Sequence, residues 1–392
     1  MAESDFTKKG YSLIIDGKYY NTLDIESFSM MMKDPSYCYK FYWLEAIVQL
    51  ISEDIRETTF DAIIDEMICN AWYPVREFHI HLSGMQLDGQ VRDGLERAVL
   101  LLTGLSDLPA NASKVEIKNA IAEHNSELKT YKEQLTNMVP YRALAGFFNK
   151  SSEAADWGSV RRMTAYIERI NRHTVLLPYI LGEESKLKKK VYFQDAWVEM
   201  IQDQMVSILG WIQYEKVKWL QNNNPEVPGL IYKLAPMDEK MRKLNNVRKL
   251  WEGILDVREI KDVFTGEPVV LKQYDVDHFI PWSFVMNDEL WNLMPMDSSL
   301  NSSKSNRLPK WSPFFIRFAK NQFIMYQLIH EKEGIRKLYE SCYRDNLHSL
   351  WAGQELYRKG NSEEEFINIL EKNMQPVYDS ARRQGYEVWN RG

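Results

Sequence analysis

The sequence contains few cysteines and no long apolar run. Its three cysteines, in a chain of 392 residues, are widely separated and lack metal-ligand spacing: Cys38, Cys69 and Cys342. Such sparse use fits free, mostly buried thiols in a reducing compartment. No apolar run approaches the ~18 residues of a membrane span, and the first residues contain no apolar signal-like segment. We therefore expect a cytoplasmic protein that does not associate with a membrane.

An excess of positive charge is also absent, because the formal net charge is −6. The overall charge therefore does not indicate nucleic-acid binding, and only local basic segments could. The sequence shows no internal repeat, low-complexity segment, Walker loop or Rossmann glycine pattern, so no motor or nucleotide-sensing module is visible. Its length allows two or three domains, and its 45% hydrophobic share is ordinary for a folded protein.

Helical spacing of apolar residues dominates both ends of the chain. We predict a mainly α-helical protein with an embedded α+β element. The predicted regions are a helical N-terminal region at 1–228, a central domain at 229–312 and a helical C-terminal region at 313–392. The segment 222–229, rich in asparagine and proline, is the predicted hinge before the central domain.

Two local patterns in the N-terminal region lead to further predictions. An Asp-Gly pair between β-rich runs predicts a hairpin at 10–21. His79 and His81 alternate with Ile80, so they could be two metal ligands on one strand face or simply part of a half-exposed strand.

The stretch from Tyr274 to Pro309 concentrates residue types that are used in phosphate chemistry. Acidic and apolar residues alternate from Tyr274 to His278, which predicts a short strand that ends in an adjacent carboxylate and imidazole. A wide loop, a second strand at 291–296 and a short helix capped by Asp297 should follow. The predicted local order is therefore strand, loop, strand and helix.

The predicted helix carries Asn301 and Lys304 three residues apart, hence on one face. We expect this face to oppose Asp277 and His278 on the first strand. A carboxylate and an amide oxygen are hard ligands that suit Mg²⁺. A histidine beside such a site can take a proton from an attacking water, which contributes roughly 10²–10⁴-fold in rate.

These residues and their spacing resemble the HNH endonuclease motif, a ββα-metal finger. The resemblance is to the subgroup that includes the HNH domain of RNA-guided CRISPR effector nucleases. The three letters of the motif fall on His278, Asn292 and Asn301, with Pro281 three residues after the histidine. The resemblance covers residues 264–309 and identifies the central domain as the expected nuclease domain.

The resemblance also implies a role for each matching residue. Asp277 and Asn301 would hold a divalent ion, Mg²⁺ in the first place, although Mn²⁺ would suit the same ligands. His278 would be the general base, and Asn292 would pin the loop and help to orient the histidine. Lys304 would contact the scissile phosphate. The implied activity is metal-dependent hydrolysis of DNA phosphodiester bonds that leaves 5′-phosphate and 3′-hydroxyl ends.

Two neighbouring features complete the comparison with the family. Many HNH proteins bind a structural zinc through paired cysteines, but the segment before the first strand has no cysteine, so we expect no structural zinc.

From Asn301 to Lys320 there are five basic residues and no acidic one, and we expect Lys304, Arg307 and Lys310 to contact nucleic acid. A solvated helix face is the alternative interpretation of this basic run.

Other interpretations stay open at this stage. The stretch could be a small α/β subdomain with coincidental polar residues, or an inactive finger retained for DNA binding. The chain could also be a nucleic-acid-binding subunit of a larger complex whose nuclease is inactive without a partner. Such a subunit would suit a restriction or antiphage-defence system by analogy of architecture. RNA also remains a candidate substrate, because the predicted site contacts phosphate and not the 2′-hydroxyl.

Overall fold

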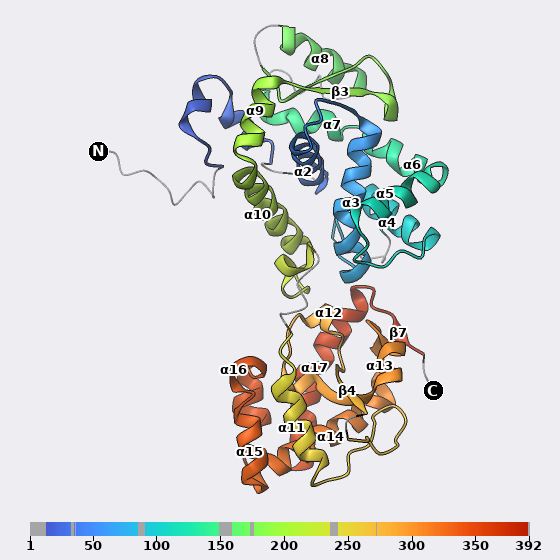
Figure 1. Cartoon of the computed structure of the whole chain (residues 1–392), viewed down its shortest axis with the longest axis vertical. Helices are drawn as coiled ribbons and strands as arrows, with labels where there is room; N and C mark the ends of the chain where they lie inside the picture. The colour runs from blue at the N-terminus through green and yellow to red at the C-terminus, as the bar shows by residue number, and fades with distance from the viewer. Residues whose placement is uncertain are drawn as a thin grey trace, which may run out of the picture. The chain divides into compact units, whose positions relative to one another are not determined.

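The computed structural model describes residues 13–32, 35, 37–84, 91–148, 159–172, 176–235, 242–271 and 273–390. The chain divides into two compact units, Met1–Pro225 and Glu226–Gly392 (Figure 1). The boundary falls inside 222–229, the segment predicted to be a hinge. Helices predominate in both units and the sheets are small, so the predicted mainly α-helical class is confirmed.

Two helices form the centre of the first unit, α2 (Tyr39–Ser52) and α3 (Phe60–Phe78), which pack against each other. Trp43 of α2 and Trp72 of α3 are fully buried. Helix α3 begins after Thr59, whose side chain accepts a hydrogen bond from a backbone N–H of the first turn. The other helices described in this unit are η1 (Gly17–Asn21), α1 (Ile25–Met30), α4 (Gly94–Leu105), α5 (Lys114–Glu123), α6 (Asn125–Thr136), α7 (Val139–Arg142), η2 (Ala143–Phe147), α8 (Val160–Arg172), η4 (Lys186–Lys188), α9 (Asp195–Asp203) and α10 (Met205–Asn223).

A small antiparallel sheet accompanies these helices, in the order β1 (Glu57–Thr59), β3 (Lys190–Phe193) and β2 (Tyr179–Leu181). In its register Thr58 lies opposite Val191. The buried residues of β3 alternate with partly exposed ones, as expected for a sheet with one face against the core.

The hairpin predicted at 10–21 is not formed by the residues that the structure describes there. Gly17–Asn21 is a 3-10 helix, η1, and residues 10–12 lie outside the described part. The carboxylate of Asp16 accepts a hydrogen bond from the Lys18 N–H, so this aspartate caps a helix and does not start a hairpin turn. The prediction was wrong because Asp-Gly suits both local structures.

In the second unit, an antiparallel pair of strands lies at the centre of the predicted site. Strand β4 (Tyr274–His278) pairs with β5 (Leu293–Asp297), so that Val276 lies opposite Pro295. Burial alternates along β4, and its odd-numbered side chains are the more exposed ones. Helix α13 (Ser298–Lys304) follows β5 directly and packs against both strands (Figure 1).

Long helices surround this pair, chiefly α11 (Asn245–Leu255), α14 (Trp311–Glu331) and α17 (Glu363–Arg383). Helix α17 begins at Ser362 with a reciprocal capping box, in which serine and Glu365 satisfy each other's backbone N–H groups. The remaining described elements are η5 (Leu230–Lys233), α12 (Trp282–Val285), η7 (Leu290–Asn292), β6 (Leu308–Pro309), α15 (Glu333–Glu340), α16 (Tyr343–Asn346), η8 (Ala352–Leu356) and β7 (Val388–Trp389).

One hydrophobic core extends from Val247 to Trp389 in the second unit. The rings of Phe279 and Phe318 lie 4.7 Å apart, and those of Phe264 and Phe314 lie 5.0 Å apart. The Gln322 side chain donates a 2.7 Å hydrogen bond to a β5 carbonyl. The ranges 229–312 and 313–392, predicted as separate regions, therefore belong to a single compact unit. None of the helices described in either unit is both long and apolar enough to cross a membrane.

Candidate functional site

The predicted residues of the first strand and of the following helix meet in the structure. Asp275 and Asp277 are two positions apart on β4 and therefore share the face on which α13 packs. Asp297 fixes the start of α13 by accepting hydrogen bonds from two backbone N–H groups, at 2.9 and 3.1 Å. Asn301 and Lys304 lie one helical turn apart on α13, and both reach β4.

Lys304 is held against the carboxylate beside the histidine. Its ammonium lies 2.8 Å from Oδ2 of Asp277 and donates a 2.9 Å hydrogen bond to the His278 carbonyl. Only 1% of its side chain is exposed. A buried ammonium needs such partners, because burial without them would cost several kcal/mol. In this structure the lysine therefore neutralises Asp277.

Asn301 approaches a carboxylate that the motif did not single out. Its Nδ2 donates a 3.3 Å hydrogen bond to Oδ2 of Asp275. Asp275, Asp277 and the Asn301 carbonyl together provide hard oxygen donors of the kind that Mg²⁺ and Mn²⁺ take. Sequence reasoning missed Asp275, although its two-residue spacing from Asp277 on a strand was the signal.

This donor set contains only two carboxylates and an amide. Among the residues that the structure describes, no three His, Cys, Asp or Glu side chains form a group able to hold a metal ion. A divalent ion would therefore need water or substrate oxygens to complete its coordination, as Mg²⁺ commonly does.

His278 is buried at the end of β4, with 1% of its side chain exposed. Its Nε2 lies 3.1 Å from the Asn287 carbonyl oxygen, and its Nδ1 lies 3.3 Å from Nη2 of Arg242. A carbonyl only accepts and a guanidinium only donates, so Nε2 carries the proton and Nδ1 presents a lone pair. The neutral tautomer that results is the one that can accept a proton at Nδ1.

Asp288 supports the imidazole from the same side as the carbonyl. Its Oδ1 lies 3.1 Å from Nε2 of His278, and its Oδ2 accepts a 2.8 Å hydrogen bond from the Lys243 N–H. Burial raises the pKa of Asp288, but the contacts with His278, Lys243 and Arg242 outweigh it, so the pKa lies below its ordinary value. Sequence reasoning placed Asp288 in a loop and gave it no role.

Asn292 joins the two ends of the loop between the strands. Its Oδ1 accepts a 2.8 Å hydrogen bond from the Ile280 N–H, and its Nδ2 donates a 2.8 Å bond to the Ile280 carbonyl. Its own carbonyl accepts from the Phe279 N–H at 2.8 Å. The side chain is fully buried. This is the geometry expected of a residue that pins the loop behind the histidine.

Arg307 and Lys310, predicted to contact nucleic acid, line two separate cavities after α13. The Arg307 guanidinium donates to the carbonyls of Lys304 and Ser303 at the end of that helix, and it lines a cavity of about 440 Å³. Lys310 lines a cavity of about 330 Å³ together with Trp311. Both cavities also contact β7. The structure thus places both cations at the surface beside β7, whereas it buries Lys304.

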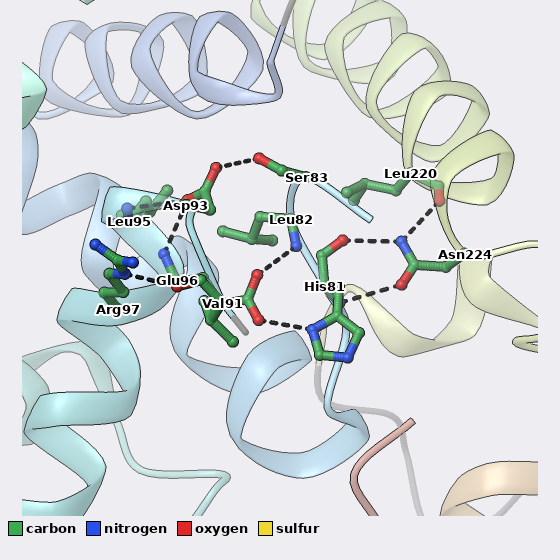
Figure 2. Close-up of polar contacts among 10 residues, drawn as sticks. All are labelled: His81, Leu82, Ser83, Val91, Asp93, Leu95, Glu96, Arg97, Leu220 and Asn224. Carbon is green, nitrogen blue, oxygen red and sulfur yellow. Dashed lines mark hydrogen bonds and ion pairs between the residues drawn. The ribbon is translucent and has the colours of Figure 1, made fainter. Parts of the chain in front are cut away.

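The two histidines of the N-terminal region do not lie on a strand. His79 follows α3 in the left-handed conformation, and burial lowers its pKa to about 4. His81 lies 2.8 Å from a carboxylate oxygen of Glu96, whose other oxygen accepts from the Leu82 N–H, as Figure 2 shows. Asn224 exchanges two hydrogen bonds with the His81 backbone. This network ties a loop to two helices, which is a structural role.

Comparison with known proteins gives a match to one segment of the chain. Residues 262–310 match a family model described as HNH endonuclease. This range contains the strand pair, α13 and the predicted catalytic residues, so the match supports the HNH family for this part of the chain. It indicates nuclease activity on nucleic acid, and nucleases of this family typically use a divalent metal ion. No curated protein and no solved structure matches the chain significantly.

Proposed function

We propose that this chain is a metal-dependent HNH endonuclease that hydrolyses DNA phosphodiester bonds. The observation that carries the proposal is the position of His278, whose Nδ1 lone pair lies at the end of the strand that also bears Asp277. Asn301 faces that strand from α13. The narrower likeness to the HNH domain of RNA-guided CRISPR effector nucleases is part of the proposal and rests on the motif spacing alone.

In the proposed reaction His278 acts as general base. A water attacks the phosphorus and gives its proton to Nδ1, the bond to the 3′ oxygen breaks, and that oxygen takes a proton from solvent, so that a 5′-phosphate and a 3′-hydroxyl remain. Asn287 and Asp288 hold the Nε2 side of the ring, so the accepting nitrogen keeps its orientation. Asn292 keeps the loop that carries both residues in place.

Asp277 and Asn301, with Asp275 beside them, would hold the divalent ion, for which Mg²⁺ is proposed. When bound, the ion polarises the phosphate and stabilises the leaving oxygen. Lys304 neutralises Asp277 in the structure. We propose that, with an ion on that carboxylate, the Lys304 ammonium would leave Asp277 and contact the scissile phosphate. Arg307 and Lys310 are proposed as more distant contacts with the nucleic-acid backbone.

Cleavage of supercoiled plasmid by the purified chain tests the function. Wild type and His278→Ala are compared with Mg²⁺, with Mn²⁺ and with EDTA, and a single-stranded RNA is run beside the plasmid. We expect metal-dependent nicking or linearisation that the variant loses while its melting temperature stays near that of wild type. Cleavage by the variant at the wild-type rate would refute His278 as the base, and cleavage of RNA alone would refute DNA as the substrate.

A partner-gated nuclease is the second candidate, and burial of the site favours it. His278 and Lys304 are each only 1% exposed. A partner that rearranged these contacts could switch the nuclease on, as would suit a restriction or antiphage-defence complex. Vigorous cutting of DNA by the isolated monomeric chain would refute this candidate.

A further inference from the structure

Arg242, which lies outside the matched family segment, contacts the imidazole of His278. Its Nη2 is 3.3 Å from Nδ1, the nitrogen that would accept the proton. The guanidinium also stacks over the Trp282 ring, with 5.5 Å between its carbon and the ring centre. Its Nε lies 3.9 Å from Oδ1 of Asp288. The histidine and two groups beside it thus contact one arginine.

Exposure differs sharply within this group. The side chain of Arg242 is 40% exposed, whereas those of His278 and Asp288 are 1% and 6% exposed. The guanidinium therefore forms part of the boundary between the buried imidazole and solvent. A water or phosphate that approached Nδ1 along this side would meet the arginine first.

The backbone beside Arg242 is fixed to the loop that orients His278. The Lys243 N–H donates to Asp288, and Nδ2 of Asn346 donates both to the Lys243 carbonyl, at 3.0 Å, and to the Asp288 carbonyl, at 2.8 Å. Asn346 is fully buried. The arginine and the histidine are therefore positioned by the same buried amide, so their proximity is built into the fold.

We propose that Arg242 is a phosphate-binding residue of the active site that covers Nδ1 of His278 until a nucleic-acid phosphate takes the guanidinium. This inference rests on the proposed function. In the structure the guanidinium makes one long hydrogen bond to a neutral ring. A phosphate offers it two parallel, charge-assisted bonds, which are shorter and stronger. Binding of the substrate would then move the guanidinium away from Nδ1 and expose the base. During this movement the guanidinium can stay in contact with the Trp282 ring.

Chemical modification tests whether Arg242 covers Nδ1 of His278, and it does not require nuclease activity. Diethyl pyrocarbonate reacts with an accessible, unprotonated imidazole nitrogen, and peptide mass spectrometry measures the rate at His278 in the full-length chain. We expect Arg242→Ala to react several-fold faster there than wild type, with the rate at His330 unchanged as an internal reference. The matched control is Arg336→Ala, an exposed arginine of α15, which should react as wild type does. Equal rates at His278 in wild type and Arg242→Ala would overturn the inference.

Single-turnover cleavage of a labelled DNA duplex tests the phosphate contact. We expect Arg242→Ala to lower the cleavage rate constant on the order of 10²-fold, as does loss of one transition-state donor. Arg242→Lys keeps the charge but loses the paired donors, so its rate constant should lie between those of wild type and Arg242→Ala. An Arg242→Ala rate equal to or above the wild-type rate would overturn the phosphate role.

The two measurements separate this inference from the proposed function. If wild type cleaves and His278→Ala does not, the nuclease stands, and Arg242→Ala alone decides the role of the arginine. If wild type cleaves nothing, the proposed function fails for the isolated chain, while the modification rate at His278 still decides whether Arg242 covers the ring. Thermal melting of each variant excludes unfolding as the cause of a faster modification.

Discussion

Lys304 and Asp277 form a buried ion pair, 2.8 Å from Nζ to Oδ2, in the place where the family resemblance puts a divalent ion. The proposed ion would therefore compete with the lysine for one carboxylate. Lys304→Met should destabilise the metal-free chain by about 3 kcal/mol or more, because it leaves a largely buried carboxylate without its cation. Mn²⁺ should then raise the melting temperature of the variant more than that of wild type.

The control for this prediction is a lysine in a surface ion pair. Lys337 is 70% exposed and lies 2.9 Å from Glu333, so Lys337→Met should change stability by less than about 0.5 kcal/mol. Thermal denaturation with and without Mn²⁺ measures both the stability of each variant and the shift in melting temperature that Mn²⁺ causes. Equal shifts by Mn²⁺ in wild type and Lys304→Met would show that ion and lysine do not share Asp277.

Asn292 should matter for folding before it matters for chemistry. Asn292→Ala removes both side-chain hydrogen bonds to Ile280 and leaves buried backbone groups without a partner, which should cost about 2–4 kcal/mol. Asn292→Asp keeps the acceptor and loses the donor, so its cost should be intermediate. Urea unfolding measures the free energy of unfolding of both variants.

A matched asparagine gives the baseline for that measurement. Asn373 donates one hydrogen bond to Ile369 within α17 and is only partly buried, so Asn373→Ala should cost about 1 kcal/mol or less. If Asn292→Ala unfolded at the same urea concentration as Asn373→Ala, the loop would not depend on Asn292.

A buried lysine near the loop predicts a pH dependence of stability. Lys233 is fully buried, donates a 2.6 Å hydrogen bond to the Phe284 carbonyl, and has its pKa lowered by burial from 10.5 to about 7. Between these values the unfolded chain binds more protons than the folded one. The free energy of unfolding should therefore rise as the pH increases from 7 towards 10, by roughly 1.4 kcal/mol per unit of pKa difference at most.

Lys233→Met should abolish this part of the pH dependence. Denaturation of wild type and variant at pH 7, 8 and 9 gives the difference in slope, in which the contributions of all other groups cancel. Lys243→Met serves as the control, since Lys243 is 56% exposed and paired with Asp345. A Lys233→Met slope equal to that of wild type would refute the lowered pKa.

The local order of the site could be predicted from the sequence because its elements carry strong short-range signals. Alternation from Tyr274 to His278 predicted β4, and Asp297 predicted the start of α13. The wide loop predicted between the strands instead contains the short helix α12 after Pro281. Spacing on one helix face likewise predicted that Asn301 and Lys304 would both face the first strand.

The surroundings of the histidine could not be predicted, because they depend on tertiary packing. Arg242 lies 36 residues before His278, and no local period connects them. Burial of Lys304 against Asp277 follows from the way α13 docks on the strands, whereas the sequence indicates only a cation on that face. The shared core has the same cause, since the contact of Phe279 with Phe318 joins segments that look separate in sequence.

The parallel pairing of β6 with β7 determines what a truncation of the chain would remove. Leu308 and Pro309, just after α13, pair with Val388 and Trp389. Removal of residues 363–390 would take away that partner strand together with the α17 part of the core. The segment directly after α13 therefore depends on a distant part of the sequence for its strand pairing and its packing.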